Sequence, residues 1–115
     1  MRKVYYLSTC STCKRIMDDL NLSNFEQQDI KTTAITADQL EQMKEMSGSY
    51  ESLFSRKAMK FRSMGLNEMI LEEKDYRKYI LDEYTFLKRP VFIIDDQIFV
   101  GNSKKVVEEL KALLN

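Results

Sequence analysis

A chain of 115 residues, 43% of them hydrophobic, is close to the usual size of one domain, so we expect residues 1–115 to form a single domain. The 18 basic and 18 acidic residues cancel, which argues against direct binding to nucleic acid or to acidic membranes. The absence of histidine excludes hydrolases in which histidine activates a serine or cysteine. No apolar run is long enough to cross a bilayer, and the run at 1–7 is too short for a signal peptide, so we expect a cytoplasmic protein.

Strand and helix patterns alternate in the first part of the chain. The apolar run Val4–Leu7 predicts a buried strand, and apolar residues at helical spacing predict a helix over about 11–20. The segment Phe25–Ile30 predicts a second strand, so the three elements form a right-handed parallel unit. The sequence Thr36–Gln39 is a capping box that predicts the start of the next helix, which Gly48 ends.

The middle of the chain, roughly Gly48 to Leu87, is predicted to be all-helical. One helix is expected before Gly65 and a longer one from about Glu72. The aromatic and methionine stripes of this region are interpreted as core rather than as a cofactor site, because helical spacing alone explains them. These stripe residues are Tyr50, Leu53, Phe54, Ala58, Phe61, Met64, Tyr76, Tyr79 and Ile80.

The end of the chain returns to strands. Val91–Ile94 and Gln97–Val100 predict a hairpin around Asp95 and Asp96, and a final helix is predicted from about Lys104. Pro90, the only proline, predicts a rigid turn before the third strand, and an X–Pro bond is the kind at which the cis isomer is accessible.

Both cysteines, Cys10 and Cys13, lie where the first helix is predicted to begin. Two thiols at this spacing can close a small disulfide, and a helix N-terminus stabilises the thiolate of the first one. In a reducing compartment such a pair indicates a redox site. Two other interpretations stay open: a zinc site would need ligands that the chain lacks, and two inert thiols would have Ser11, Thr12 and Lys14 as a poor core lining.

The chain resembles the ArsC/Spx family in Cys10–Arg15, Asp29–Lys31, Ser55–Lys57 and Arg89–Val91. This family comprises glutaredoxin-linked arsenate reductases and Spx-type transcription regulators. The resemblance implies an α/β fold of the thioredoxin-like type, with a mixed four-stranded sheet and a helical subdomain inserted at about 48–87. It covers essentially the whole chain.

The arsenate reductases of the family imply roles for individual residues. By resemblance, Cys10 is the nucleophile that attacks a small oxyanion or a thiol substrate, and Cys13 resolves the mixed species. The candidate anion-binding residues are Arg89, Arg56, Thr12 and Lys14. The resemblance further implies no bound cofactor, with glutathione and glutaredoxin, or thioredoxin, as the external reductant and redox partner.

Two departures from the enzymes point toward the regulators. Gly101 and Asn102 stand where the enzymes usually carry an arginine, and this chain has both cysteines where the enzymes often keep only the first. In the regulators the two cysteines are a redox switch, and the segment around Gly48 would correspond to the surface that meets the RNA polymerase alpha subunit. The chain ends at Asn115 without the basic tail of those regulators, which favours the enzyme interpretation by a small margin.

Simpler interpretations of the basic residues stay open beside these. Arg89 could be a surface residue next to a turn, and Arg56 could lie on a solvated helix face. Lys14 and Arg15 could lower the pKa of a thiol or form the solvated face of their helix.

Overall fold

The computed structural model describes residues 1–115, which form two compact units. The first unit comprises Met1–Ala34 and Arg89–Asn115, and the second comprises Ile35–Lys88. The helical insertion was expected over about 48–87, and the second unit also includes the helix before it. The assignment of the whole chain to one domain stays a prediction.

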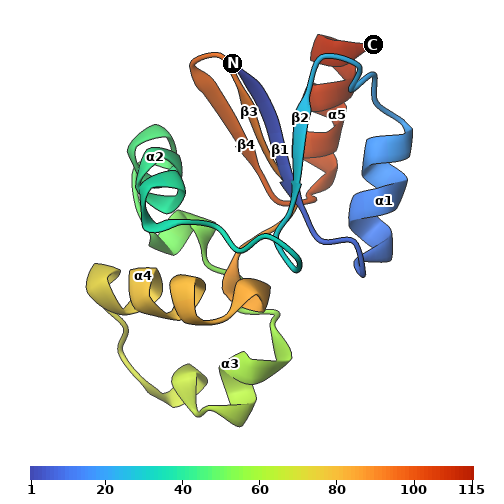
Figure 1. Cartoon of the computed structure of the whole chain (residues 1–115). Helices are drawn as coiled ribbons and strands as arrows, with labels where there is room; N and C mark the ends of the chain where they lie inside the picture. Colours follow the sequence, from blue (N-terminus) through green and yellow to red (C-terminus); the bar gives the residue numbers. More distant parts are fainter. The chain divides into compact units, whose positions relative to one another are not determined.

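The first unit is built on a sheet of four strands in the order β2-β1-β3-β4 (Figure 1). The strands are β1 (Arg2–Tyr6), β2 (Glu26–Asp29), β3 (Val91–Ile94) and β4 (Gln97–Val100). Strand β1 pairs with β2 in parallel and with β3 antiparallel, while β3 and β4 form the antiparallel hairpin. The predicted mixed four-stranded sheet is therefore confirmed.

Two helices, α1 (Ser11–Asp18) and α5 (Lys104–Leu114), lie on the same side of this sheet (Figure 1). Apolar residues at helical spacing direct one stripe of each helix toward the sheet. Ile16 of α1 and Leu110 of α5 are buried against Val4 and Phe92, which share one face of β1 and β3. This cluster fixes α1, and therefore the cysteine pair at its start, on the sheet.

The hairpin has the predicted bounds, and Asp95 at its turn has a positive φ of 55°. Asp is one of the few residues other than glycine that adopt a positive φ. The peptide bond between Arg89 and Pro90, just before the hairpin, is cis.

The second unit begins with α2 (Ala37–Ser47), whose N-terminus confirms the predicted capping box. Gln39 N donates to Thr36 Oγ1 at 3.1 Å, and Thr36 N donates to Gln39 Oε1 at the same distance. Gly48 ends the helix with a φ of 101°, a left-handed conformation that glycine adopts without strain.

The rest of this unit consists of short elements: η1 (Glu51–Leu53), α3 (Met59–Ser63), η2 (Leu66–Glu68), α4 (Glu73–Asp82) and η3 (Tyr84–Phe86). The single helix predicted before Gly65 is wrong, because Phe54 is extended and forms a β-bridge with Leu87. The Phe54 ring stacks on Phe86 with 5.0 Å between ring centroids. Packing of this aromatic pair favours the break in the helix.

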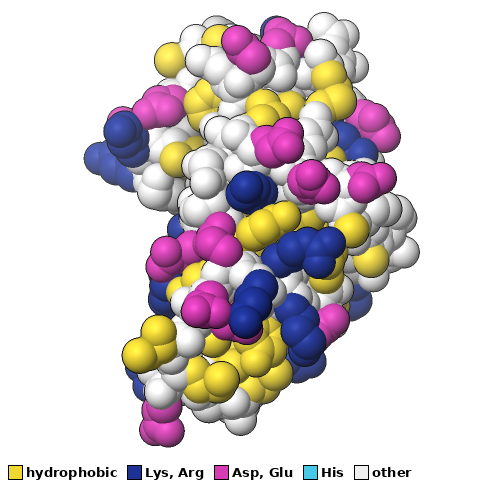
Figure 2. Space-filling view, turned by 90° about the vertical axis from the view of Figure 1, so that its left-hand side faces the viewer, with side chains coloured by type: hydrophobic (Ala, Val, Ile, Leu, Met, Phe, Trp, Pro, Cys, Tyr) yellow, Lys and Arg dark blue, Asp and Glu magenta, His cyan; other side chains and the backbone are white.

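Two of the aromatic residues predicted for the core of the second unit are buried, while Tyr50, Phe61 and Tyr79 are only partly buried and one methionine lies outside the core. Phe54 and Tyr76 are buried, whereas Met64 is 49% exposed, because it lies at the end of the five-residue helix α3. Figure 2 shows basic and acidic side chains interspersed over the visible face, which agrees with the zero net charge. None of the helices is both long and apolar enough to span a membrane.

Candidate active site

The cysteine loop connects β1 to α1 and places Cys10 at the N-cap position of the helix. Cys10 N donates to Leu7 O at 3.0 Å, and Cys10 O accepts from Lys14 N at 3.2 Å. These two bonds hold the backbone of Cys10 between the turn and the first turn of the helix. The Cys10 side chain is partly buried.

The pKa of Cys10 lies below its ordinary value. Burial by itself raises this pKa, but the N–H of Cys13, the Cys13 thiol, the charge of Arg89 and the N–H of Thr12 together lower it by more. All of these groups favour the negatively charged sulfur, as expected at a helix N-terminus. Cys10 is therefore the better nucleophile of the two cysteines.

Cys13 lies one turn inside α1, with none of its surface exposed. Burial raises the pKa of its thiol to about 12, and the hydrogen bond and charge of Cys10 act in the same direction. Both cysteines are free thiols in this structure. A thiol with a lowered pKa next to a thiol with a raised pKa is the arrangement in which the first attacks as a thiolate and the second follows.

Arg89 lies two residues before the start of β3, directly before Pro90, and is half-buried. Its charge lowers the pKa of both thiols, so the structure brings Arg89 to the cysteine pair although about 75 residues separate them in sequence. Asn102 Nδ2 donates to Arg89 O at 3.4 Å, and Gly101 N donates to Pro90 O at 2.9 Å. The residues after β4 therefore hold the backbone of Arg89 and Pro90.

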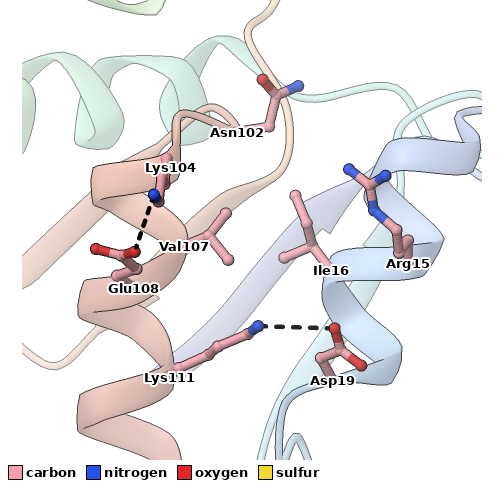
Figure 3. A pocket seen from close by; sticks show the side chains of 8 residues that line it. All are labelled: Arg15, Ile16, Asp19, Asn102, Lys104, Val107, Glu108 and Lys111. Atoms are coloured by element: carbon pink, nitrogen blue, oxygen red, sulfur yellow. Dashed lines mark ion pairs between the residues drawn. The ribbon is translucent and has the colours of Figure 1, made fainter.

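The two basic residues of α1 are exposed. Lys14 is exposed, and Arg15 lines a groove of about 400 Å³ between α1 and α5 (Figure 3). Arg15 and Asn102 lie at one end of the groove, and an ion pair of 3.8 Å between Lys111 and Asp19 lies at the other. The charge that lowers the pKa of Cys10 is that of Arg89, while Lys14 and Arg15 are both exposed, and the anion-binding role of Lys14 stays a prediction.

A search with family models matches residues 5–110 of the chain to the ArsC family. The chain belongs to the ArsC family. Its fold and its neighbouring cysteines are those of an arsenate-reductase-like thiol redox protein. Proteins of the ArsC family use no bound cofactor and rely on external reductants such as glutaredoxin or thioredoxin.

Solved structures share the thioredoxin-like fold of this ArsC chain over nearly its whole length. An arsenate reductase from Vibrio cholerae has a TM-score of 0.74 at 17% identity, covering 95% of this chain and 96% of its own. A possible arsenate reductase from Streptococcus mutans has a TM-score of 0.74 at 22% identity, covering 96% and 97%. A Staphylococcus aureus protein has a TM-score of 0.75 at 23% identity, covering 96% and 98%. No curated protein sequence matches the chain.

Two predicted site residues of the ArsC chain lie in the second unit. Arg56 is exposed, and its Nη2 donates to Glu51 Oε2 at 2.7 Å and to Tyr76 Oη at 2.9 Å. The hydrogen bond to Glu51 raises the pKa of Arg56. Gly48 is exposed at the end of α2. The anion-binding role of Arg56 and the partner surface at Gly48 stay predictions.

A carboxylate for which the sequence pattern predicts no role, that of Asp29, contacts the cysteine loop. Asp29, the last residue of β2, accepts from Ser8 N at 3.2 Å and from Lys31 N at 3.1 Å, both at Oδ1. The hydroxyl of Ser8 is the main cause that lowers the pKa of Asp29. Asp29 belongs to the segment Asp29–Lys31 that carries part of the family resemblance, and its place at the end of the strand predicted to run parallel to β1 was the signal that could have identified it. No group of three or more His, Cys, Asp or Glu residues lies close enough to hold a metal ion.

Proposed function

We propose that this ArsC-family chain is a thiol oxidoreductase of the arsenate reductase kind, with Cys10 as the nucleophile and Cys13 as the resolving thiol. The observation that supports this proposal is the unequal pair of thiols. The pKa of Cys10 is lowered, the pKa of Cys13 is raised to about 12, and the charge of Arg89 acts on both. An oxyanion substrate and a redox protein partner follow from the likeness to arsenate reductases. We infer a cytoplasmic location, where a redox protein partner keeps the pair reduced.

In the proposed reaction the Cys10 thiolate attacks the arsenic of arsenate, and one oxygen leaves as water with the protons it gains. The Cys13 sulfur then attacks the Cys10 sulfur, and its proton passes to an oxygen of the departing arsenite. The Cys10–arsenic bond breaks with its electron pair going to arsenic, so arsenate is reduced to arsenite while the two thiols are oxidised to a disulfide. Glutaredoxin with glutathione, or thioredoxin, reduces the disulfide and restores the site.

Arg89 supports this step because its guanidinium carries a fixed charge and a planar fork of donors that matches two oxygens of a tetrahedral anion. Arg56, Thr12 and Lys14 are the further candidates for binding the oxyanion. The guanidinium of Arg56 forms an ion pair with Glu51, so an anion would have to compete with that carboxylate. We therefore assign the larger share of anion binding to Arg89.

The test is calorimetry of arsenate and sulfate binding to Arg89→Lys, with Arg62→Lys as the matched control because Arg62 is exposed on α3 and makes no ion pair. We expect Arg89→Lys to cost about 1–3 kcal/mol of binding free energy, as for a lost hydrogen bond to a charged group. The control should bind as the parent does. Equal binding by Arg89→Lys and the parent, or no binding by the parent, would contradict the oxyanion-enzyme proposal.

The alternative is an Spx-type redox regulator that binds the RNA polymerase alpha subunit. Two features favour it: both cysteines are present, and Asn102 stands where the enzymes usually carry an arginine and instead holds the backbone of Arg89. Arsenate turnover with a glutaredoxin system, and binding of the purified alpha subunit to the reduced and oxidised chain, separate the two functions. Turnover without binding supports the enzyme, and redox-dependent binding without turnover supports the regulator.

A further inference from the structure

We propose that Asp29 is a positioning residue for the active site, and that its carboxylate holds the loop that presents the Cys10 sulfur. This inference rests on the proposed function, because it concerns the same thiolate. It adds a residue that does not touch the sulfur and acts through the backbone of Ser8.

The carboxylate joins the ends of two neighbouring strands. Tyr6 of β1 pairs with Asp29 of β2, and Ile30 N donates to Tyr6 O at 2.9 Å. Where the two strands end, Asp29 Oδ1 accepts from the backbone N–H of Ser8, and the hydroxyl of Ser8 also bonds to the carboxylate. The loop after β1 is therefore fixed to the end of β2 by a charged acceptor rather than by strand pairing.

Ser8 lies inside the turn that positions both sulfurs. The turn closes where Cys10 N donates to Leu7 O at 3.0 Å. The backbone N–H of Leu7 also favours the thiolate of Cys13. Because Ser8 is next to Leu7 and two residues before Cys10, its attachment to Asp29 limits the movement of the backbone on both sides.

The charge of Asp29 would act on Cys10 in the opposite direction to this positioning. A nearby negative charge disfavours a thiolate and raises its pKa, whereas a well-held loop keeps the helix N–H groups directed at the sulfur and lowers it. The charged groups that face this region are Arg89 at the thiols and Lys31 beside Asp29. Removal of the charge should therefore lower the pKa of Cys10, whereas removal of the hydrogen-bond acceptor should raise it, and variants can separate the two effects.

The experiment measures the rate of Cys10 alkylation against pH, resolved by mass spectrometry, for Asp29→Ala and Asp29→Asn. Asparagine keeps an oxygen that accepts from Ser8 and Lys31 but has no charge, and alanine loses both. We expect Asp29→Ala to raise the Cys10 pKa by about one unit, which slows alkylation about tenfold well below the pKa. Asp29→Asn should restore the parental rate or exceed it. The matched control is Asp18→Ala, which removes an exposed carboxylate of α1 that makes no hydrogen bond to the loop.

An unchanged Cys10 pKa in Asp29→Ala would overturn the inference. An equal fall of the Cys10 pKa in Asp29→Ala and Asp29→Asn would also overturn it, because Asp29 would then act only through its charge. Should Asp29→Ala fail to fold by circular dichroism, Ser8→Ala decides instead. It removes the hydroxyl donor alone and should raise the Cys10 pKa by a smaller amount, and an unchanged pKa would overturn the inference. An ordinary Cys10 pKa in the parent chain would instead contradict the proposed function, so the two failures are distinguishable.

Discussion

The raised pKa of Cys13 predicts how the stability of the reduced protein changes with pH. The perturbation is Cys13→Ala, made in a Cys10→Ser background so that only one thiol titrates. The folded-state pKa of Cys13 is about 12, and its ordinary value is 9.0. A thiol whose pKa is raised by folding keeps its proton in the folded state while the unfolded chain loses it. The free energy of unfolding is therefore unaffected by the ionisation of Cys13 below about pH 9 and falls as the pH rises above that value.

The size of the effect follows from these two values. At about pH 10 the unfolded thiol is mostly ionised and the folded one is still protonated, so Cys13 destabilises the folded state by about 1 kcal/mol relative to neutral pH. The pKa of Cys13 stays raised when Cys10 is removed, because burial is the largest cause of the shift and Cys13 has no exposed surface. Tyr5, whose pKa is also raised to about 12, titrates in both proteins and cancels in the comparison.

The assay is urea unfolding under reducing conditions at about pH 8 and about pH 10 for Cys10→Ser and for Cys10→Ser with Cys13→Ala. The free energy of unfolding of Cys10→Ser should fall by about 1 kcal/mol more than that of the double variant between the two pH values. Equal pH dependence in the two proteins would refute the reasoning that Cys13 is held protonated. The proposed roles of Cys10 as the nucleophile and Cys13 as the resolving thiol would then lose their physical basis.

Three further predictions concern the oxidised pair, the end of α2 and the core. Mild oxidation should link Cys10 to Cys13 within one chain, seen as a loss of two hydrogens in the intact mass of the monomer, and disulfide-linked dimers alone would contradict a resolving role for Cys13. Gly48→Ala should lower the free energy of unfolding by about 1–2 kcal/mol because of the left-handed backbone, although nothing lies within 4 Å of the added Cβ, and unchanged stability in urea would contradict this. Phe92→Ala should cost about 3–5 kcal/mol, because Phe92 is fully buried in the sheet core, and a loss below about 1 kcal/mol would mean that α1 and α5 do not pack on it as described.

The elements that the sequence predicted well are those specified by neighbouring residues. The capping box of Thr36 and Gln39 and the hairpin around Asp95 depend on hydrogen bonds and backbone conformations within a few positions. The place of Cys10 at the start of α1 follows in the same way, from apolar spacing after it and the strand before it. Local signals of this kind survive in the folded chain because no tertiary contact opposes them.

Tertiary packing decided what the sequence pattern left open or got wrong. Phe54 has helical spacing with its neighbours, yet stacking on Phe86 and pairing with Leu87 keep it extended. The polar partners of the site likewise come from distant positions. Arg89 reaches the thiols from just before β3, Asp29 reaches Ser8 from the end of β2, and only the pairing of β1 with both of these strands brings them together. The charge around a thiol is set by its neighbours in space, and hydrophobic periodicity records which side of an element is buried but not which polar group arrives from another strand.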